Sequence, residues 1–280
     1  MKKFQGEEGK CMKTPITYYG GKQKLAEKIV SIMPEHRLYC EPFFGGGAVF
    51  FSKPKSYLEV INDTNENLIS FWRELKYNFE CLYEMVSNTL DSETEYNRAK
   101  DIYYGRIKAS LTEQAWAFWV VMNMGFQGTV YGGWSWDNGA SRSHSGIGLR
   151  HKRERFTQEL ADRLQDVQIS CRDALVCIKN RDTANTLFYL DPPYFNATQK
   201  HYSGFKEDDM VRLLDTLAGI KGKFILSNYN SPLLDRYIEE NRWIKKEIHT
   251  HCSLYTKTKK FHKVKKTEVL VTNFEYETPD

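Results

Sequence analysis

The stretch Leu38-Tyr39-Cys40-Glu41-Pro42-Phe43-Phe44-Gly45-Gly46-Gly47 runs from a short apolar strand pattern into three glycines. A short helical pattern follows over Ala48–Ser52, and a second strand pattern covers Tyr57–Ile61. The order strand, glycine turn, helix, strand is typical of a parallel, doubly wound α/β sheet. We therefore expect an α/β fold whose first strand ends just before the glycine turn.

Later segments continue the same alternation of strands and helices. Further strands are expected at Val167–Ser170, Leu187–Leu190 and Lys223–Ser227, and a closing strand pair at Trp243–Thr250 and Glu268–Phe274. Helices are expected at Leu25–Met33, Asn65–Tyr77, Glu207–Leu217 and Pro232–Glu240. These patterns predict one sheet domain built from two parts of the chain.

The middle of the chain has a different character. Phe79–Met124 predicts two or three helices, and Gly125–Gly148 predicts a loop or hairpin rich in glycine, serine and aromatic residues. Such a long connection is unusual without a functional reason. We predict a flexible N-terminus at 1–13, a sheet domain at 14–78 and 156–280, and an insertion at 79–155.

Composition excludes several classes of protein. The 280 residues carry a net charge of +4, and no apolar run approaches the length of about 20 residues that spans a bilayer. The six cysteines form no CxxC pair, which favours reduced thiols and a cytoplasmic protein. Two basic stretches, Arg142–Arg155 and Lys257–Lys266, indicate either solvated faces or contacts with phosphate groups.

The tetrapeptide Asp191-Pro192-Pro193-Tyr194 follows an apolar strand pattern and carries unusual chemistry. A carboxylate and a proline-fixed carbonyl can accept both hydrogens of an exocyclic amine, while a tyrosine ring stacks on a planar base. The simpler interpretation is a Pro-Pro turn that ends a strand.

Three further features indicate a nucleotide-like ligand. The glycines Gly45 and Gly47 allow the backbone to approach a ligand, on which Phe43 can pack; a tight structural turn is the alternative. Asp63 follows the second strand, where it can accept hydrogen bonds from ribose hydroxyls or cap a helix. Lys22 can pair with a ligand carboxylate, or it is a solvated lysine in a glycine loop.

In this order and spacing, the motifs resemble those of the Dam-like adenine-specific DNA methyltransferases (D12 class, alpha group). The matching segments are Tyr18-Tyr19-Gly20-Gly21-Lys22, then Glu41-Pro42-Phe43 with Gly45 and Gly47, then Asp191-Pro192-Pro193-Tyr194. Asp63-Thr64-Asn65 and Leu226-Ser227-Asn228 match more weakly. The resemblance implies a Rossmann-like doubly wound methyltransferase sheet, with 79–155 as a helical and hairpin target-recognition domain.

The resemblance also assigns site residues. It implies that S-adenosyl-L-methionine is bound by Tyr18, Lys22, Phe43, Gly45, Gly47, Asp63 and Asp191, and that Asp191, Pro192, Pro193 and Tyr194 are catalytic. The products would be S-adenosyl-L-homocysteine and N6-methyladenine, formed on a flipped-out base of double-stranded DNA without a metal. Asp173 matches loosely as a contact of the cofactor's adenine. Phe195–Phe205 is interpreted as a mobile flap over the flipped base, and a plain surface loop is the alternative.

Contacts with DNA are predicted from residue type. Asn123, Gln127, Asn138 and Arg142 have groups that pair with base edges, and Lys152, Arg153, Lys263 and Lys266 would hold phosphates. The segment Tyr131-Gly132-Gly133-Trp134-Ser135-Trp136 departs from the hairpin of the proteins that methylate GATC, so this sequence does not predict GATC specificity.

Several alternatives remain open at the level of sequence. The same chemistry could act on RNA adenine or cytosine N4, or the chain could be an inactive DNA-binding scaffold. A nicotinamide oxidoreductase is disfavoured because Phe50 stands where the third glycine of a dinucleotide motif would fall. We expect a bacterial or phage-encoded protein that is a monomer or weak dimer, with a cognate restriction nuclease as a candidate partner.

Overall fold

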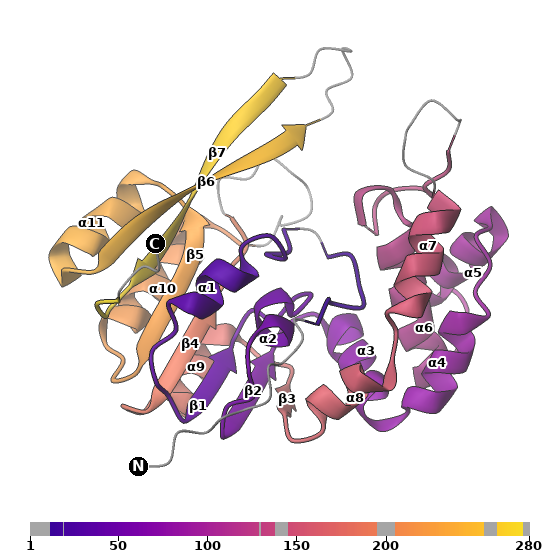
Figure 1. The fold of residues 1–280 in the computed structure, drawn as a ribbon, viewed down its shortest axis with the longest axis horizontal. Coiled ribbons are helices and arrows are strands. Elements are labelled where there is room, and N and C mark those ends of the chain that lie inside the picture. The colour runs from indigo at the N-terminus through magenta and orange to yellow at the C-terminus, as the bar shows by residue number, and fades with distance from the viewer. Residues whose placement is uncertain are drawn as a thin grey trace. The chain divides into compact units, whose positions relative to one another are not determined.

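The structure is a computed structural model that describes residues 12–18, 20–128, 130–137, 145–194, 205–254 and 262–276. The chain divides into two compact units (Figure 1). Unit 1 contains Met1–Ser31 and Phe44–Asp173, and unit 2 contains Ile32–Phe43 and Ala174–Asp280. Within the described residues, no helix is long and apolar enough to cross a membrane.

Seven strands form one sheet in the order β3-β2-β1-β4-β5-β7-β6. Their bounds are β1 Leu38–Glu41, β2 Leu58–Asn62, β3 Gln168–Ser170, β4 Thr186–Leu190, β5 Lys223–Tyr229, β6 Ile244–Leu254 and β7 His262–Thr272. The pairs β1–β4, β4–β5 and β2–β3 are parallel, while β5–β7 and β6–β7 are antiparallel. The predicted α/β fold is therefore confirmed, including its closing strand pair.

The closing hairpin is longer than the sequence pattern predicted. Strands β6 and β7 pair from Ile244 opposite Thr272 to Leu254 opposite His262. The outer part of this hairpin is rich in lysine, so its hydropathy gives no strand signal. Backbone hydrogen bonds between the two strands extend the ladder regardless of that polarity.

Unit 1 holds most of the helices. They are α1 Ala26–Ser31, α2 Ala48–Ser52, α3 Glu66–Tyr77, α4 Phe79–Ser87, α5 Glu93–Tyr103, α6 Leu111–Met124, α7 Ser145–Glu154 and α8 Gln158–Leu164, with a 3₁₀ turn at Phe126–Gly128. Helix α6 begins with a capping box between Ser110 and Glu113, and its residues from Ala115 onward are buried. It packs against α3, α4, α5 and α7 (Figure 1). The predicted domains separated 79–155 from 14–78. The compact units divide the chain differently, because α6 packs on α3 and both belong to unit 1.

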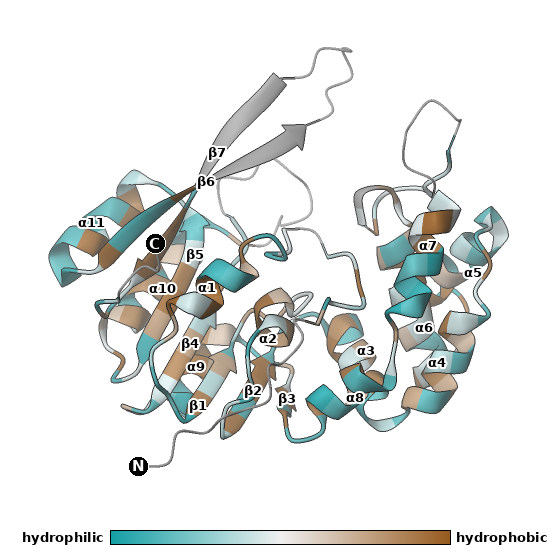
Figure 2. Cartoon of the chain, viewed as in Figure 1, coloured by the Kyte–Doolittle hydropathy of each residue, from teal (hydrophilic) through white to brown (hydrophobic). Residues whose placement is uncertain are grey.

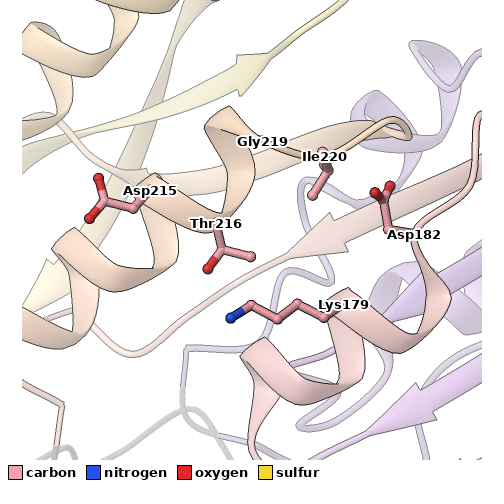
Figure 3. Close-up of a pocket in the computed structure, with 6 residues that line it drawn as sticks. All are labelled: Lys179, Asp182, Asp215, Thr216, Gly219 and Ile220. Atoms are coloured by element: carbon pink, nitrogen blue, oxygen red, sulfur yellow. The ribbon is translucent and has the colours of Figure 1, made fainter.

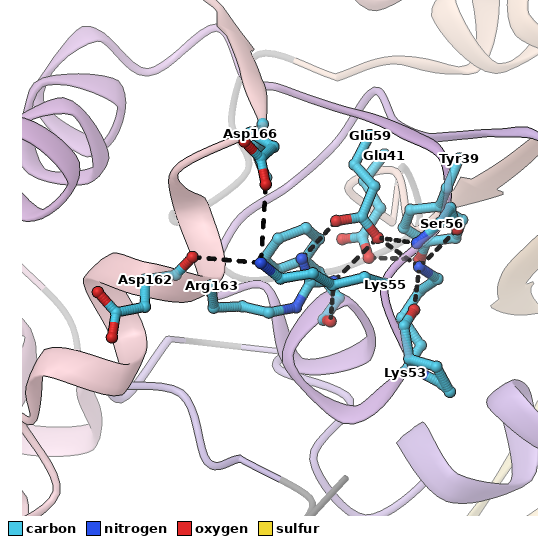
Figure 4. A network of polar contacts seen from close by, with 12 residues as sticks. Tyr39, Glu41, Lys53, Lys55, Ser56, Glu59, Asp162, Arg163 and Asp166 are labelled. Atoms are coloured by element: carbon cyan, nitrogen blue, oxygen red, sulfur yellow. Dashed lines mark hydrogen bonds and ion pairs between the residues drawn. The ribbon is translucent and has the colours of Figure 1, made fainter. Parts of the chain in front are cut away.

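A buried ion network lies within unit 1. The carboxylate of Glu59 pairs with Lys53 at 2.5 Å and with both terminal nitrogens of Arg163 (Figure 4). Burial acts to raise the pKa of Glu59, but the hydrogen bonds and charges of Arg163 and Lys53 outweigh it and lower that pKa. The Arg163 guanidinium also lies 3.7 Å from the centre of the Phe50 ring. Each charge is paired, as a stable interior requires.

In unit 2, helices α9 Ala174–Arg181, α10 Glu207–Ala218 and α11 Pro232–Asn241 accompany the central strands. Every residue of β4 is buried. Helix α10 buries Met210, Leu213, Leu214 and Leu217 on one face, and α11 shows hydrophilic and hydrophobic residues on different faces (Figure 2). Because β1, β4 and β5 are parallel, their carboxyl ends lie at one edge of the sheet.

Candidate active site

The glycine turn after β1 is packed against Tyr18. Gly45 and Gly47 adopt φ angles of +49° and +66°, which favour glycine. A Cβ atom on Gly46 would lie 2.9 Å from Cβ of Tyr18, and one on Gly47 would lie 2.6 Å from Cζ of Phe44. The glycines are therefore required by the packing of unit 1 itself, and they hold the Tyr18 ring against the turn.

Asp63 is tied to the same turn. Its two carboxylate oxygens accept hydrogen bonds from the backbone N–H groups of Gly45 and Asn65, both at 3.0 Å. Burial raises the pKa of Asp63, while these backbone hydrogen bonds oppose the shift. Asn65, rather than Asp63, caps helix α3, since its side chain accepts from Asn67 and Leu68. The alternative interpretation of Asp63 as a helix cap is therefore wrong.

Lys22 is buried rather than solvated. Its side chain is 5% exposed, and Nζ donates to the carbonyl of Gly20 at 3.0 Å. The Gly21 N–H donates to the carbonyl of Tyr18, which closes the loop on itself. The alternative of a solvated lysine in a glycine loop is wrong, because unit 1 encloses this cation. Tyr19 lies outside the described residues.

The end of β4 carries the second cluster, which belongs to unit 2. Asp191, Pro192, Pro193 and Tyr194 follow Leu190 directly, with Asp191 and Tyr194 partly exposed. The Tyr194 ring packs against Tyr229 with ring centres 4.1 Å apart and planes tilted by 33°. Burial, followed by the charges of Asp191 and Glu268, holds the pKa of Tyr194 well above its usual range.

Tyr189 on β4 is influenced by the same charges of Asp191 and Glu268 as Tyr194. Burial raises its pKa well above the usual range, and the charges of Asp191, Glu41 and Glu268 raise it further. Glu41 is 1% exposed and accepts a 2.5 Å hydrogen bond from the Tyr39 hydroxyl (Figure 4). Three carboxylates therefore give this edge of unit 2 a negative potential, which suits a positively charged ligand.

Sequence reasoning missed Glu41, Tyr229 and Glu268 as parts of this cluster. Glu41 was within a quoted motif but had no role, and the other two lie on strands whose pairing is not local in sequence. The antiparallel register places Glu268 opposite Tyr229. The predicted ligand residue Phe43 lies in unit 2, partly exposed, with its ring edge on Phe205 at 6.3 Å.

Asn123 does not present its amide to solvent. It is 8% exposed; Oδ1 accepts from the N–H of Thr17 at 3.0 Å, and Nδ2 donates to the carbonyl of Pro15 at 3.1 Å. Its side chain therefore fixes the segment that precedes Tyr18. Its polar atoms are thus bonded within the protein, and the contact of Asn123 with base edges stays a prediction.

Lys152 and Arg153 are also engaged inside unit 1. Lys152 Nζ donates to the Asn123 carbonyl at 2.6 Å, and burial lowers its pKa to about 8, against the charge of Asp91. Arg153 donates to the carbonyl of Thr89 at 2.8 Å. These hydrogen bonds tie both cations to backbone carbonyls, and their predicted contact with phosphates stays a prediction. Among the described residues of Arg142–Arg155, the exposed arginines are Arg150 and Arg155.

The remaining predicted DNA contacts are not described. Asn138, Arg142 and the flap residues 195–204 lie outside the described residues, and the side chains of Gln127, Lys263 and Lys266 are not described either. The loosely matched Asp173 is exposed in unit 1.

The loop from 125 to 137 is held firmly by α5. The Gly132 carbonyl accepts hydrogen bonds from the Tyr96 hydroxyl at 2.9 Å and from Lys100 Nζ at 3.0 Å. On this anchored backbone, large aromatic side chains remain exposed: Phe126 at 57%, Tyr131 at 62% and Trp136 at 65%. Exposed rings on an anchored loop suit stacking against planar partners.

A cavity of about 440 Å³ lies elsewhere in unit 2 (Figure 3). It is lined by Lys179, Asp182, Asp215, Thr216, Gly219 and Ile220. None of these residues belongs to either cluster at the strand ends. The cavity therefore does not alter the assignment of the site.

A mostly parallel sheet, a glycine turn after β1 and a carboxylate–proline–proline–tyrosine segment after β4 are together typical of the methyltransferase class. Residues 18–252 match the family described as D12 class N6 adenine-specific DNA methyltransferase. The chain belongs to this family, so it is an S-adenosylmethionine-dependent enzyme that methylates adenine in DNA.

Known relatives agree with this assignment. The Type II methyltransferase M1.LlaDCHI of Lactococcus lactis subsp. cremoris is 30% identical over 96% of this chain and 98% of its own length. The Type II methyltransferase M.MjaIII of Methanocaldococcus jannaschii is 26% identical, covering 80% of this chain and 87% of its own. A DNA adenine methylase of Vibrio cholerae is 27% identical, covering 71% and 74%.

Proposed function

We propose that the glycine turn and its neighbours bind the cofactor and that the segment Asp191–Tyr194 binds the target adenine. The observation that carries this proposal is the segment Asp191–Tyr194 itself, where a carboxylate and a tyrosine packed against Tyr229 follow a fully buried strand. S-adenosyl-L-methionine, when bound, supplies a methyl group on a positively charged sulfur.

The cofactor end uses the glycine turn and its neighbours. Gly45 and Gly47 leave backbone accessible to a ligand, and Asp63, which is held by backbone N–H groups, retains acceptor capacity for ribose hydroxyls. We propose the same cofactor-binding residues that the sequence predicted: Tyr18, Lys22, Phe43, Gly45, Gly47, Asp63 and Asp191. The negative potential around Tyr189 and Tyr194 supports the binding of a cationic sulfonium.

At the base end, Asp191 and the carbonyl of Pro192 accept the two hydrogens of adenine N6. This contact turns the nitrogen lone pair toward the methyl group, and Tyr194 stacks on the ring of the flipped base. Pro193 stiffens the segment by fixing its backbone angle. N6 gains a bond to carbon while the sulfur–carbon bond breaks, after which N6 releases one proton; the products are N6-methyladenine and S-adenosyl-L-homocysteine.

Contact with double-stranded DNA is proposed for the loop from 125 to 137 and for two exposed cations in and just after α7. Phe126, Tyr131 and Trp136 offer rings, while Arg150 and Arg155 offer charges for phosphates. We further propose catalysis without a metal, a monomer or weak dimer, and action in the cytoplasm alongside a cognate restriction nuclease. Relatives named Type II methyltransferases support the last point.

Calorimetry tests the cofactor assignment directly. Asp63→Asn should weaken the binding of S-adenosyl-L-methionine by roughly 10-fold to 100-fold, the value of a lost hydrogen bond to a charged group. The matched control is Asp166→Asn, an exposed aspartate of the same unit that should leave affinity unchanged. Equal affinity of the Asp63 variant and the unmodified enzyme would remove Asp63 from the site.

A further inference from the structure

The residues behind Tyr194 form a second layer that the motifs do not cover. Strand register places Tyr229 of β5 opposite Glu268 of β7. Since side chains alternate between faces with a period of two, Ser227 and Tyr229 share a face with Glu268. The parallel register of β4 with β5 adds Tyr189 to this face, because Tyr189 lies opposite Ile225.

Two hydroxyls on this face are buried: Tyr189 is 3% exposed and Ser227 is fully buried. They interact with each other, since Ser227 opposes the rise in the pKa of Tyr189 that burial and the charges of Asp191 and Glu41 cause. This face therefore carries polar groups beside Tyr229 and Glu268.

We propose that the cross-strand pair Tyr229–Glu268 is a positioning pair for methyl transfer, in which Tyr229 holds the Tyr194 ring and Glu268 adds its negative charge to that of Asp191. The proposal rests on the assigned roles of Asp191 and Tyr194. The stack of Tyr229 on Tyr194, with ring centres 4.1 Å apart, fixes the ring that the flipped adenine meets.

The charge of Glu268 acts on the chemical step. As the methyl group moves, positive charge passes from sulfur to N6, and it stays there until the proton leaves. Two carboxylates near this path stabilise the cation more than one does, because the site is partly dry. The charges of Glu268 and Asp191 both raise the pKa of Tyr194, which supports their joint action at this ring.

The test compares charge and shape at each position. Glu268→Gln should lower the single-turnover rate of methyl transfer about 10-fold to 100-fold while the KM values for DNA and cofactor change less than about threefold. Glu268→Asp should restore part of the rate. Glu247→Gln, which removes an exposed carboxylate on the neighbouring strand β6, is the matched control and should transfer normally.

Tyr229 provides a second, independent comparison. Tyr229→Phe keeps the stacked ring and should transfer at close to the normal rate, whereas Tyr229→Ala should lose about 10-fold or more in rate. Near-ultraviolet circular dichroism of each variant confirms that it is folded. Normal rates for Glu268→Gln and Tyr229→Ala in an active enzyme would overturn the proposal. Failure of the unmodified enzyme to modify adenine would instead overturn the proposed function.

Discussion

The end of β4 and the segment from α6 to α7 both bury charge, but they use it differently. At the end of β4, burial and then the charges of Asp191 and Glu268 raise the pKa values of Tyr189 and Tyr194, and Glu41 adds to the rise for Tyr189. Around α7, Lys152 and Arg153 donate to backbone carbonyls of their own unit. The carboxylates at the end of β4 leave a negative potential for a ligand, whereas the cations of α7 stabilise the fold through hydrogen bonds to the backbone.

Removal of Asp191 should give the largest effect. Asp191→Ala should slow methyl transfer about 1000-fold or more, because it removes both the acceptor for N6 and a charge that stabilises the transition state. DNA binding, measured by fluorescence anisotropy, should stay within a few-fold of normal. Asp208→Ala, which changes an exposed aspartate of α10, is the control. A normal rate for Asp191→Ala would contradict the proposal that the negative charge at the end of β4 serves the reaction.

Substitutions of two neighbouring arginines, Arg153 and Arg155, distinguish a cation that stabilises the fold from one that contacts DNA. Arg153→Met should lower the free energy of unfolding by about 1–3 kcal/mol, because carbonyls of Ser87 and Thr89 lose their donor. Arg155→Ala should leave stability unchanged and reduce the slope of log affinity against log salt by about 0.9. Urea denaturation and salt titration measure the two quantities. Lower stability of Arg155→Ala together with a reduced salt slope for Arg153→Met would mean that Arg153 contacts phosphate.

The glycine turn should respond to one added methyl group. Gly46→Ala places a Cβ 2.9 Å from Cβ of Tyr18, so the Tyr18 segment has to shift. We expect a loss of about 1–3 kcal/mol in stability and weaker binding of S-adenosyl-L-methionine. Gly133→Ala is the matched control, since nothing lies within 4 Å of its added Cβ. Thermal unfolding with and without cofactor measures both effects, and equal behaviour of the two variants would refute the packing argument.

The smallest expected effect concerns pH. Burial lowers the pKa of Lys152 from 10.5 to about 8, so between these values the unfolded chain binds more protons than the folded one. Stability contributed by this site therefore rises as pH increases from about 8 to about 10.5. Lys152→Met should remove that rise, whereas Lys24→Met, an exposed lysine, should keep it. Urea midpoints at pH 7.5 and 9.5 provide the measurement; an unchanged rise in the Lys152 variant would contradict it.

The sequence predicted the parts of the molecule whose signals are local. Apolar runs and glycines marked β1, β2, β4 and β5, and the segment Asp191–Tyr194 was predicted to follow its strand. Tyr229 and Glu268 escaped notice because they meet only through the pairing of β5 with β7, which no local pattern reports. Knowledge of the register between β5 and β7 is needed to see that these two residues lie opposite each other.

The predictions of DNA contact rest on residue type, whereas burial also decides the role of a residue. Asn123 and Lys152 have the right chemistry for bases and phosphates, but Asn123 lies on the very apolar α6 and Lys152 lies on α7, which packs against it. In these positions, the polar groups of both residues form hydrogen bonds with backbone atoms, because a buried polar group without a hydrogen bond lowers the stability of the fold. Residue type alone does not reveal which face of a helix is covered.

The measurement that tests the central claim most directly is nucleoside analysis of unmethylated duplex DNA after incubation with the enzyme and S-adenosyl-L-methionine, with and without a metal chelator. We predict N6-methyladenine at one mapped sequence, unaffected by the chelator, and none from Asp191→Ala. N4-methylcytosine as the product, or no modified base from a folded enzyme that binds the cofactor, would contradict the account.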